Sequence, residues 1–140
     1  TTRSVDIRLD AFLAWIDGVG GLPVFSTPIH YDLGTISGVP LSFTDVSSHE
    51  ATTFFLSCAE DSPDAIDDGA VLGSMLGVVA EGAARMAPLI DETRAPQALK
   101  AEGLVIDAEA ARAFVVLDQD DPDVPSDLCE VALEGPWVVG

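Results

Sequence analysis

The chain has 140 residues, of which 48% are hydrophobic, and it carries 24 acidic against 6 basic residues for a formal net charge of −18. The apolar content suffices for one core, which argues against a disordered chain or a second large domain. A field of this sign repels polyanions, so nucleic acid is excluded as a partner, and no apolar run reaches the roughly 18 to 20 residues that span a bilayer. We expect a soluble protein with the cytoplasm favoured, although a chain that starts at Thr1 would hide any leader peptide.

The first 37 residues are predicted to form a segment that precedes the repeats, with a strand, a short helix and a loop. Residues 5–9 alternate apolar and charged side chains, which predicts a half-buried strand. A short helix should follow, capped by Asp10 and ended by Gly18. Residues 18–28 are rich in glycine and contain two prolines, so they should form a connector. The apolar face of the helix would hold Phe12, Leu13 and Ile16.

From Ile29 onward, short β-type runs alternate with Gly, Pro and Asp, which predicts an antiparallel meander. The stretch from Ala70 to Ala87 is rich in alanine and could be a helix on local propensity alone. Its three glycines favour instead a hairpin that turns at Glu81-Gly82. The runs are IHYDLG (29–34), PLSFTDV (40–46), TTFFLSCA (52–59), LGSMLGVV (72–79) and ARMAPLI (84–90).

An internal repeat is the most informative feature of the sequence. Residues 55–65 and 114–124 share a frame of Phe, three small or apolar residues, an acidic patch and Pro-Asp, at an offset of 59 residues. Upstream, apolar runs close on Asp45 and Asp107, which align if residues 47–49 are an insertion. The unit is strand, turn, strand, acidic loop, strand and outer strand, the order of a four-stranded propeller blade.

The sequence therefore predicts an all-β fold of about two four-stranded blades of a six-bladed type β-propeller, with one short N-terminal helix. Residues 1–37 would be the lead-in, 38–99 the first blade-like repeat and 100–140 the second. Two blades cannot close a ring. The expected partners are accordingly the remaining blades of the same protein, or identical chains that complete the ring.

Several segments support a resemblance to a known family. Between residues 30 and 137 the chain resembles the C-terminal half of a family of uncharacterised bacterial β-propeller proteins, which look related to the phytase-like, strictosidine-synthase and gluconolactonase-like six-bladed propellers. The resemblance implies a propeller fold and little chemistry. It is carried by Tyr31-Asp-Leu-Gly, Gly38–Asp45, Ala59–Gly69, Lys100–Leu104, Asp120–Leu128 and Glu134-Gly-Pro-Trp137.

In the better-known relatives, Glu-Gly-hydrophobic at the start of an inner strand places a carboxylate at the channel, where it ligates a divalent cation. Glu102-Gly103-Leu104 matches that pattern, so the resemblance implies Glu102 as a ligand or catalytic carboxylate; the competing reading is a solvated strand end. The first repeat has Val39-Pro40-Leu41 at the place taken as equivalent, which leaves one such ligand.

The acidic loops have the carboxylate density of a metal site, because Ca²⁺ takes six to eight oxygen ligands. They do not follow the EF-hand pattern. Ca²⁺ is accordingly the candidate cofactor, and a salt-adapted acidic surface is the alternative. The candidate metal ligands are Glu102, Asp61, Asp64, Asp118, Asp120 and Asp121.

Two functions remain open from the sequence. The first is a non-catalytic platform that binds a small ligand, a cation or a protein. The second is a metal-assisted esterase, lactonase or phosphoesterase-like hydrolase in which Glu102 and Asp45 act as the catalytic carboxylates. For Asp45, a structural role at the end of a strand is the competing reading. Cys58 and Cys129 lack metal-site spacing, and their separation leaves a disulfide open.

Overall fold

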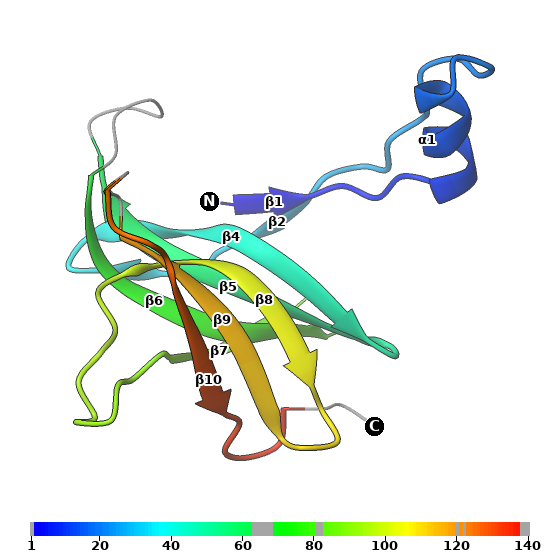
Figure 1. The fold of residues 1–140 in the computed structure, drawn as a ribbon. Coiled ribbons are helices and arrows are strands. Elements are labelled where there is room, and N and C mark those ends of the chain that lie inside the picture. Colours follow the sequence, from blue (N-terminus) through cyan, green and yellow to red (C-terminus); the bar gives the residue numbers. More distant parts are fainter. Residues whose placement is uncertain (1, 63–68, 81–82, 120, 122, 138–140) are drawn as a thin grey trace. The chain divides into compact units, whose positions relative to one another are not determined.

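The computed structural model describes residues 2–62, 69–80, 83–119, 121 and 123–137 (Figure 1). The chain divides into two compact units, Thr1–Asp32 and Leu33–Gly140. In the described residues, regular structure consists of antiparallel strands and the one helix α1. The predicted all-β class with a single short helix near the N-terminus is confirmed.

The N-terminal unit pairs β1 (Thr2–Ser4) with β2 (Ile29–Tyr31) and carries α1 (Leu9–Ile16) between them. The strand predicted over residues 5–9 is wrong. Only Ile7 of that stretch forms an isolated bridge, to Phe25. Alternation alone does not make a strand where no continuous partner strand lies alongside.

The helix begins earlier than predicted. Arg8, not Asp10, takes the N-cap position with extended backbone angles, and it offers no side-chain cap. Asp10 lies in the first turn, where it forms an ion pair with Arg8. A negative charge in the first turn also interacts favourably with the positive end of the helix dipole. Gly18 has φ +72°, which confirms the predicted left-handed stop.

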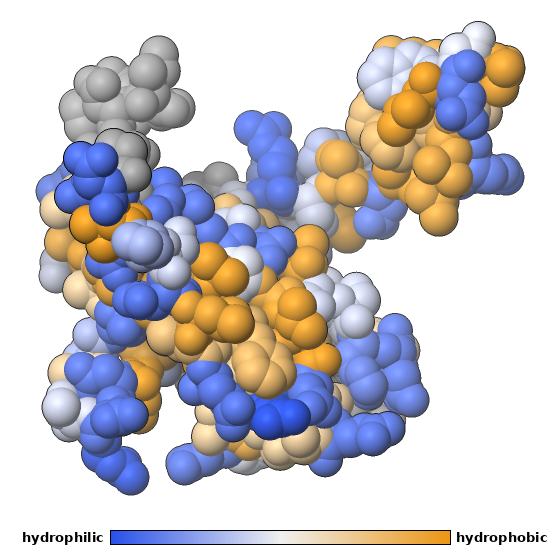
Figure 2. All heavy atoms as spheres, in the orientation of Figure 1, coloured by the Kyte–Doolittle hydropathy of each residue, from blue (hydrophilic) through white to orange (hydrophobic). Residues whose placement is uncertain are grey.

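The predicted apolar helix face is not covered in this structure. Leu13 is 50% exposed and Ile16 is 59% exposed, and α1 has no buried residue. Figure 2 shows hydrophobic residues gathered on the surface around this helix. In the described residues, no helix has the length and apolar character needed to cross a membrane.

The larger unit begins with a curled sheet of five consecutive antiparallel strands. The predicted meander is confirmed here, and the helix considered for residues 70–87 is wrong. In its place, β6 and β7 form a hairpin in which Ala80 pairs with Ala83, and the predicted turn residues Glu81 and Gly82 lie outside the described residues. The strands are β3 (Thr35–Ile36), β4 (Val39–His49), β5 (Thr52–Asp61), β6 (Ala70–Ala80) and β7 (Ala83–Pro88).

Gly77 makes room for a buried aromatic ring on this sheet. It pairs with Phe55 on β5, and the Phe55 ring lies over it. A Cβ at residue 77 would meet Phe55 Cζ at 2.3 Å and the carbonyl oxygen of Arg85 at 2.7 Å. Only glycine leaves room for the ring, which is 1% exposed.

The second sheet repeats the first with the same register. It consists of β8 (Lys100–Asp107), β9 (Arg112–Asp118) and β10 (Asp127–Ala132), in the order β10-β9-β8. Phe55 pairs with Val46, and Phe114 pairs with Val105, so both strands of the hairpin shift by the same 59 residues. The insertion at residues 47–49 is therefore wrong, and Asp45 corresponds to Leu104 rather than to Asp107.

Both hairpins also carry a bulge at nearly the same place. The pairing skips Thr44 in β4 and Glu102 in β8. The first-repeat residue that is equivalent to Glu102 therefore lies next to Thr44 in β4. The prediction that placed this residue in Val39-Pro40-Leu41 is wrong. The repeats differ in strand number, because the first includes β7 as an outer strand and the second shows three strands in its described residues.

The two sheets share one hydrophobic core. Phe54 and Leu56 of β5 pack in the same cluster as Ala113 and Val115 of β9, which occupy the equivalent register positions. Both repeats therefore turn equivalent faces toward the common core. The buried members of this cluster are Phe54, Leu56, Leu76, Val78, Leu89, Ala101, Leu104, Ala113, Val115 and Leu117.

We predict that Gly77→Ala destabilises the protein by about 1–3 kcal/mol, because the added Cβ overlaps both a packed ring and a backbone carbonyl. Urea unfolding monitored by circular dichroism measures the change. Gly21→Ala is the matched control, since a Cβ at Gly21 meets nothing within 4 Å and should leave the unfolding midpoint unchanged. Equal midpoints for the two variants would contradict the packing argument.

Candidate functional site

Asp45, one of the two carboxylates proposed for catalysis, joins the two sheets. Its Oδ2 accepts a hydrogen bond from the backbone N–H of Leu104 at 2.7 Å, and its Oδ1 accepts one from the N–H of Val46 at 2.8 Å. Leu104 lies in β8 and is 7% exposed. The carboxylate therefore satisfies a backbone donor that would otherwise be buried without a partner.

Two further side chains hold β8 in the same manner. Thr44, at the bulge of β4, donates from Oγ1 to the carbonyl oxygen of Ala101. Ser74 of β6 accepts from the N–H of Ala101 at 3.3 Å and donates to the carbonyl oxygen of Leu99 at 2.8 Å. Side chains of the first sheet thus bond to the backbone of β8 and of Leu99 just before it; we call Thr44, Asp45 and Ser74 the β8 clamp.

Glu102, the other proposed catalytic carboxylate, lies at the bulge of β8 and is paired with a lysine. Lys100 Nζ is 3.3 Å from Glu102 Oε1 and 3.4 Å from Glu60 Oε2. The Lys100 side chain is 17% exposed, whereas that of Glu102 is 43% exposed. Glu60 is further fixed by the N–H of Gly69, which donates to its Oε1 at 2.9 Å.

The charge state of Lys100 follows from this pairing. Burial of the ammonium lowers the pKa of Lys100, but the hydrogen bond with Glu102 and the charge of Glu60 outweigh burial and raise that pKa above the usual lysine value. The chain has one lysine, and the fold places it between two glutamates. The ammonium group of Lys100 therefore lies beside Glu102, the carboxylate that was predicted to ligate a divalent cation.

The other predicted metal ligands do not assemble in the described residues. Asp61 ends β5, Asp118 ends β9 opposite Lys100, and Asp121 follows β9 on the surface. Asp64 and Asp120 lie outside the described residues. Within the part of the chain that the structure describes, no three His, Cys, Asp or Glu side chains are grouped as a metal site. Cys58 and Cys129 do not form a disulfide with each other.

A groove lies between β7 and β10, and the sequence did not predict it. One pocket along it has a volume of about 550 Å³, and two adjoining pockets share residues with it. We call this the seam groove. Its apolar lining includes Leu76, Leu89, Val131, Leu133 and Trp137, and its polar lining includes Asp91, Glu92, Glu130, Glu134 and Arg94.

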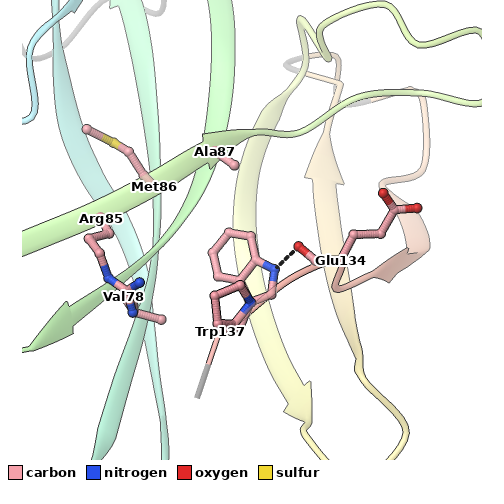
Figure 3. Close-up of a pocket in the computed structure, with 7 residues that line it drawn as sticks. Val78, Arg85, Met86, Ala87, Glu134 and Trp137 are labelled. Atoms are coloured by element: carbon pink, nitrogen blue, oxygen red, sulfur yellow. Dashed lines mark hydrogen bonds between the residues drawn. The ribbon is translucent and has the colours of Figure 1, made fainter. Parts of the chain in front are cut away.

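One end of the seam groove is shown in Figure 3. Trp137 follows β10 and faces Val78, Arg85 and Ala87 of β6 and β7, whereas the carboxylate of Glu134 points away from these residues. The indole Nε1 donates to the carbonyl oxygen of Glu134 at 3.0 Å, which fixes the ring at the wall. An aromatic ring and a guanidinium therefore border this hollow.

The opposite wall is ordered by its own hydrogen bonds. The Leu89–Gln97 segment is closed by bonds from Gln97 N–H to the Leu89 oxygen at 2.8 Å and from Asp91 N–H to the Ala95 oxygen at 2.9 Å. Asp91 Oδ1 accepts from the Thr93 hydroxyl at 2.7 Å and from two backbone N–H groups, and these bonds lower the pKa of Asp91. The hydrogen bonds within this segment therefore hold the groove wall in place by themselves.

One feature of the sequence indicates this groove. The second repeat has Gly135-Pro136 where the first has the apolar strand β7. Proline and glycine interrupt a strand, and among the described residues β10 pairs with β9 alone. The acidic residues of the groove come from three separate segments, so their convergence depends on the tertiary fold.

Comparisons with known proteins give a family without a function. A family model described as a family of unknown function (DUF6929) matches residues 1–133, so the chain belongs to that family. No curated protein matches the chain. No solved structure matches it either.

We predict that Asp45→Ala lowers the free energy of unfolding by about 1–3 kcal/mol, because it leaves the buried N–H of Leu104 without an acceptor. Asp45→Asn keeps an oxygen acceptor and should recover most of the loss. Urea unfolding of the two variants measures this. If Asp45→Ala unfolds at the wild-type urea concentration, the β8 clamp does not stabilise the fold.

We predict that Lys100→Met also costs about 1–3 kcal/mol near neutral pH, because Glu60 then loses its cation in a partly buried site. Since folding raises the pKa of Lys100, its contribution is complete below the ordinary lysine value of 10.5 and declines as the pH rises above it. The stability difference between wild type and variant should be constant from pH 7 to 10 and shrink above. Arg94→Met, an exposed cation outside this network, is the control.

Proposed function

We propose that this DUF6929 protein is a non-catalytic binding platform whose ligand is held in the seam groove. The observation that carries the proposal is that side chains of the hydrophobic core, such as Leu76 and Leu89, also line an open hollow with a charged rim. Ligand sites in proteins combine an apolar floor with a few convergent polar groups. The seam groove has both.

The rigidity of its surroundings supports this role. The β8 clamp ties the two sheets together, and the Leu89–Gln97 wall is closed by its own bonds. A preformed site loses little entropy on binding, so more of the contact energy appears as affinity.

The bonds of the two proposed catalytic carboxylates favour a platform over a hydrolase. Asp45 bonds to backbone N–H groups through both of its oxygens, and Glu102 is paired with Lys100. These bonds use part of the lone-pair capacity of each carboxylate before any metal or substrate binds. They give both residues a structural partner, which a binding platform accounts for without any catalytic step.

We retain the blade-type reading of each repeat and the larger ring as proposals. Successive units of a ring meet through opposite faces, whereas these two repeats meet through equivalent faces. The two repeats are therefore not packed against each other as successive blades, and further blades or identical chains would have to contact another surface, such as the outer face of the second sheet. That face carries exposed Val105, Val116 and Leu128, at 61%, 37% and 72% exposure.

The platform is tested by selecting ligands and mapping them to the groove. We predict that libraries of small molecules and random peptides yield a saturable ligand that changes the fluorescence of Trp137, measured in a Trp15→Phe background so that one indole reports. Ala87→Leu should weaken that ligand at least tenfold, because the larger side chain fills the groove. Ala84→Leu is the matched control, since Ala84 lies on the same strand but does not line the groove.

Two outcomes would contradict the platform. One is that neither library yields a saturable ligand. The other is that the selected ligands bind wild type, Ala87→Leu and Ala84→Leu with equal affinity, which would place them elsewhere.

A further inference from the structure

The second repeat has an open edge where the first repeat has a strand. In the first repeat, β6 bonds to β5 on one side and to β7 on the other. In the second, β10 takes the place of β6, because Cys129 pairs with Val115 as Leu76 pairs with Leu56. Among the described residues, β10 pairs with β9 alone. Its outer edge faces the seam groove, which Glu130, Val131 and Ala132 line.

We infer that this edge binds an extended basic peptide, which adds as a strand beside β10. This inference rests on the proposed function, and it names the ligand class. An exposed strand edge presents a row of N–H and C=O groups that pair with an incoming strand. The first repeat shows the arrangement within the same chain, since β7 lies against β6 over the pairs from Met75–Pro88 to Ala80–Ala83.

The groove lining indicates the side chains of the peptide. Successive side chains of a strand point to opposite faces, so one set meets the floor and the other set meets the rim. The floor is apolar, with Leu89, Leu133 and Trp137. Four acidic residues, Asp91, Glu92, Glu130 and Glu134, line the groove together with two basic residues, Arg94 and Arg85, and Glu130 is paired with Arg112 at 3.3 Å. An alternation of apolar and basic residues fits both sets.

The charge of the whole chain acts in the same direction. With a formal net charge of −18, the protein attracts a cationic peptide over a longer range than any single rim residue does. A second copy of the chain carries the same charge and is repelled. The charge therefore favours a basic peptide over self-association at this edge.

The test uses the full chain with the Trp15→Phe substitution and an eight-residue peptide of alternating valine and lysine. We expect saturable binding that weakens as salt rises, and slowed amide hydrogen exchange in β10. The same peptide with glutamate in place of lysine should not bind. A version with every backbone nitrogen methylated, which cannot donate to β10, should not bind either.

The charge requirement is tested with matched pairs of variants. Glu92→Lys with Glu134→Lys should weaken the valine-lysine peptide at least tenfold. Glu50→Lys with Glu109→Lys makes the same change of net charge on two exposed turns outside the groove, and it should weaken binding less than threefold. Equal losses in the two pairs would mean attraction by net charge only and would overturn the site.

Other results separate this inference from the proposed function. If selected ligands lie in the groove but are acidic, small or non-extended, the platform stands and the strand-addition inference fails. Protection of β10 amides in the free protein that disappears on dilution, together with a dimer mass by light scattering, would assign the edge to a second copy and overturn the inference. Peptide binding with unchanged β10 exchange would also overturn it.

Discussion

The attachment of β8 to the first sheet is the constraint on which the larger unit depends. In the part of the chain that the structure describes, the two sheets are separate backbone ladders, so strand pairing does not join them. Thr44, Asp45 and Ser74 join them with side-chain bonds to the backbone of β8 and of Leu99. Because an unpaired buried backbone group is costly, these three residues set the position of β8, and β8 sets that of β9 and β10.

The position of the second sheet in turn creates the groove. Once β8 lies beside the first sheet, the core closes over Phe54, Leu56 and Val115, and the far edges β7 and β10 are left facing each other. The hollow between them is thus a consequence of the same clamp that fixes Asp45. Asp45, which the sequence offered as a catalytic carboxylate, is bonded through its two oxygens to the backbone N–H groups of Leu104 and Val46.

The two repeats share one strand register, but equivalent residues in them have different neighbours and different exposure. Phe55 and Phe114 occupy equivalent positions, but Phe55 lies over Gly77 and is buried. Phe114 pairs with Glu130, and the Arg112 guanidinium lies 5.1 Å from its ring centroid. Phe55, opposite a glycine, is buried, whereas Phe114, opposite a glutamate, is only half-buried.

The sequence by itself determined the class of the fold, the β6–β7 hairpin and the repeat, because period-two alternation, turn residues and self-similarity are local properties. Its three glycines within residues 70–87 also argued against a helix there. Only the tertiary structure decided the partners of Asp45, the pairing of Glu102 with Lys100 and the equivalence of Asp45 with Leu104. The tertiary structure also determined the seam groove, because its lining residues come from segments about 60 residues apart in the sequence. The physical reason is that contacts between sheets depend on which edges and faces meet in space, and one strand's pattern of residues does not encode its distant neighbour.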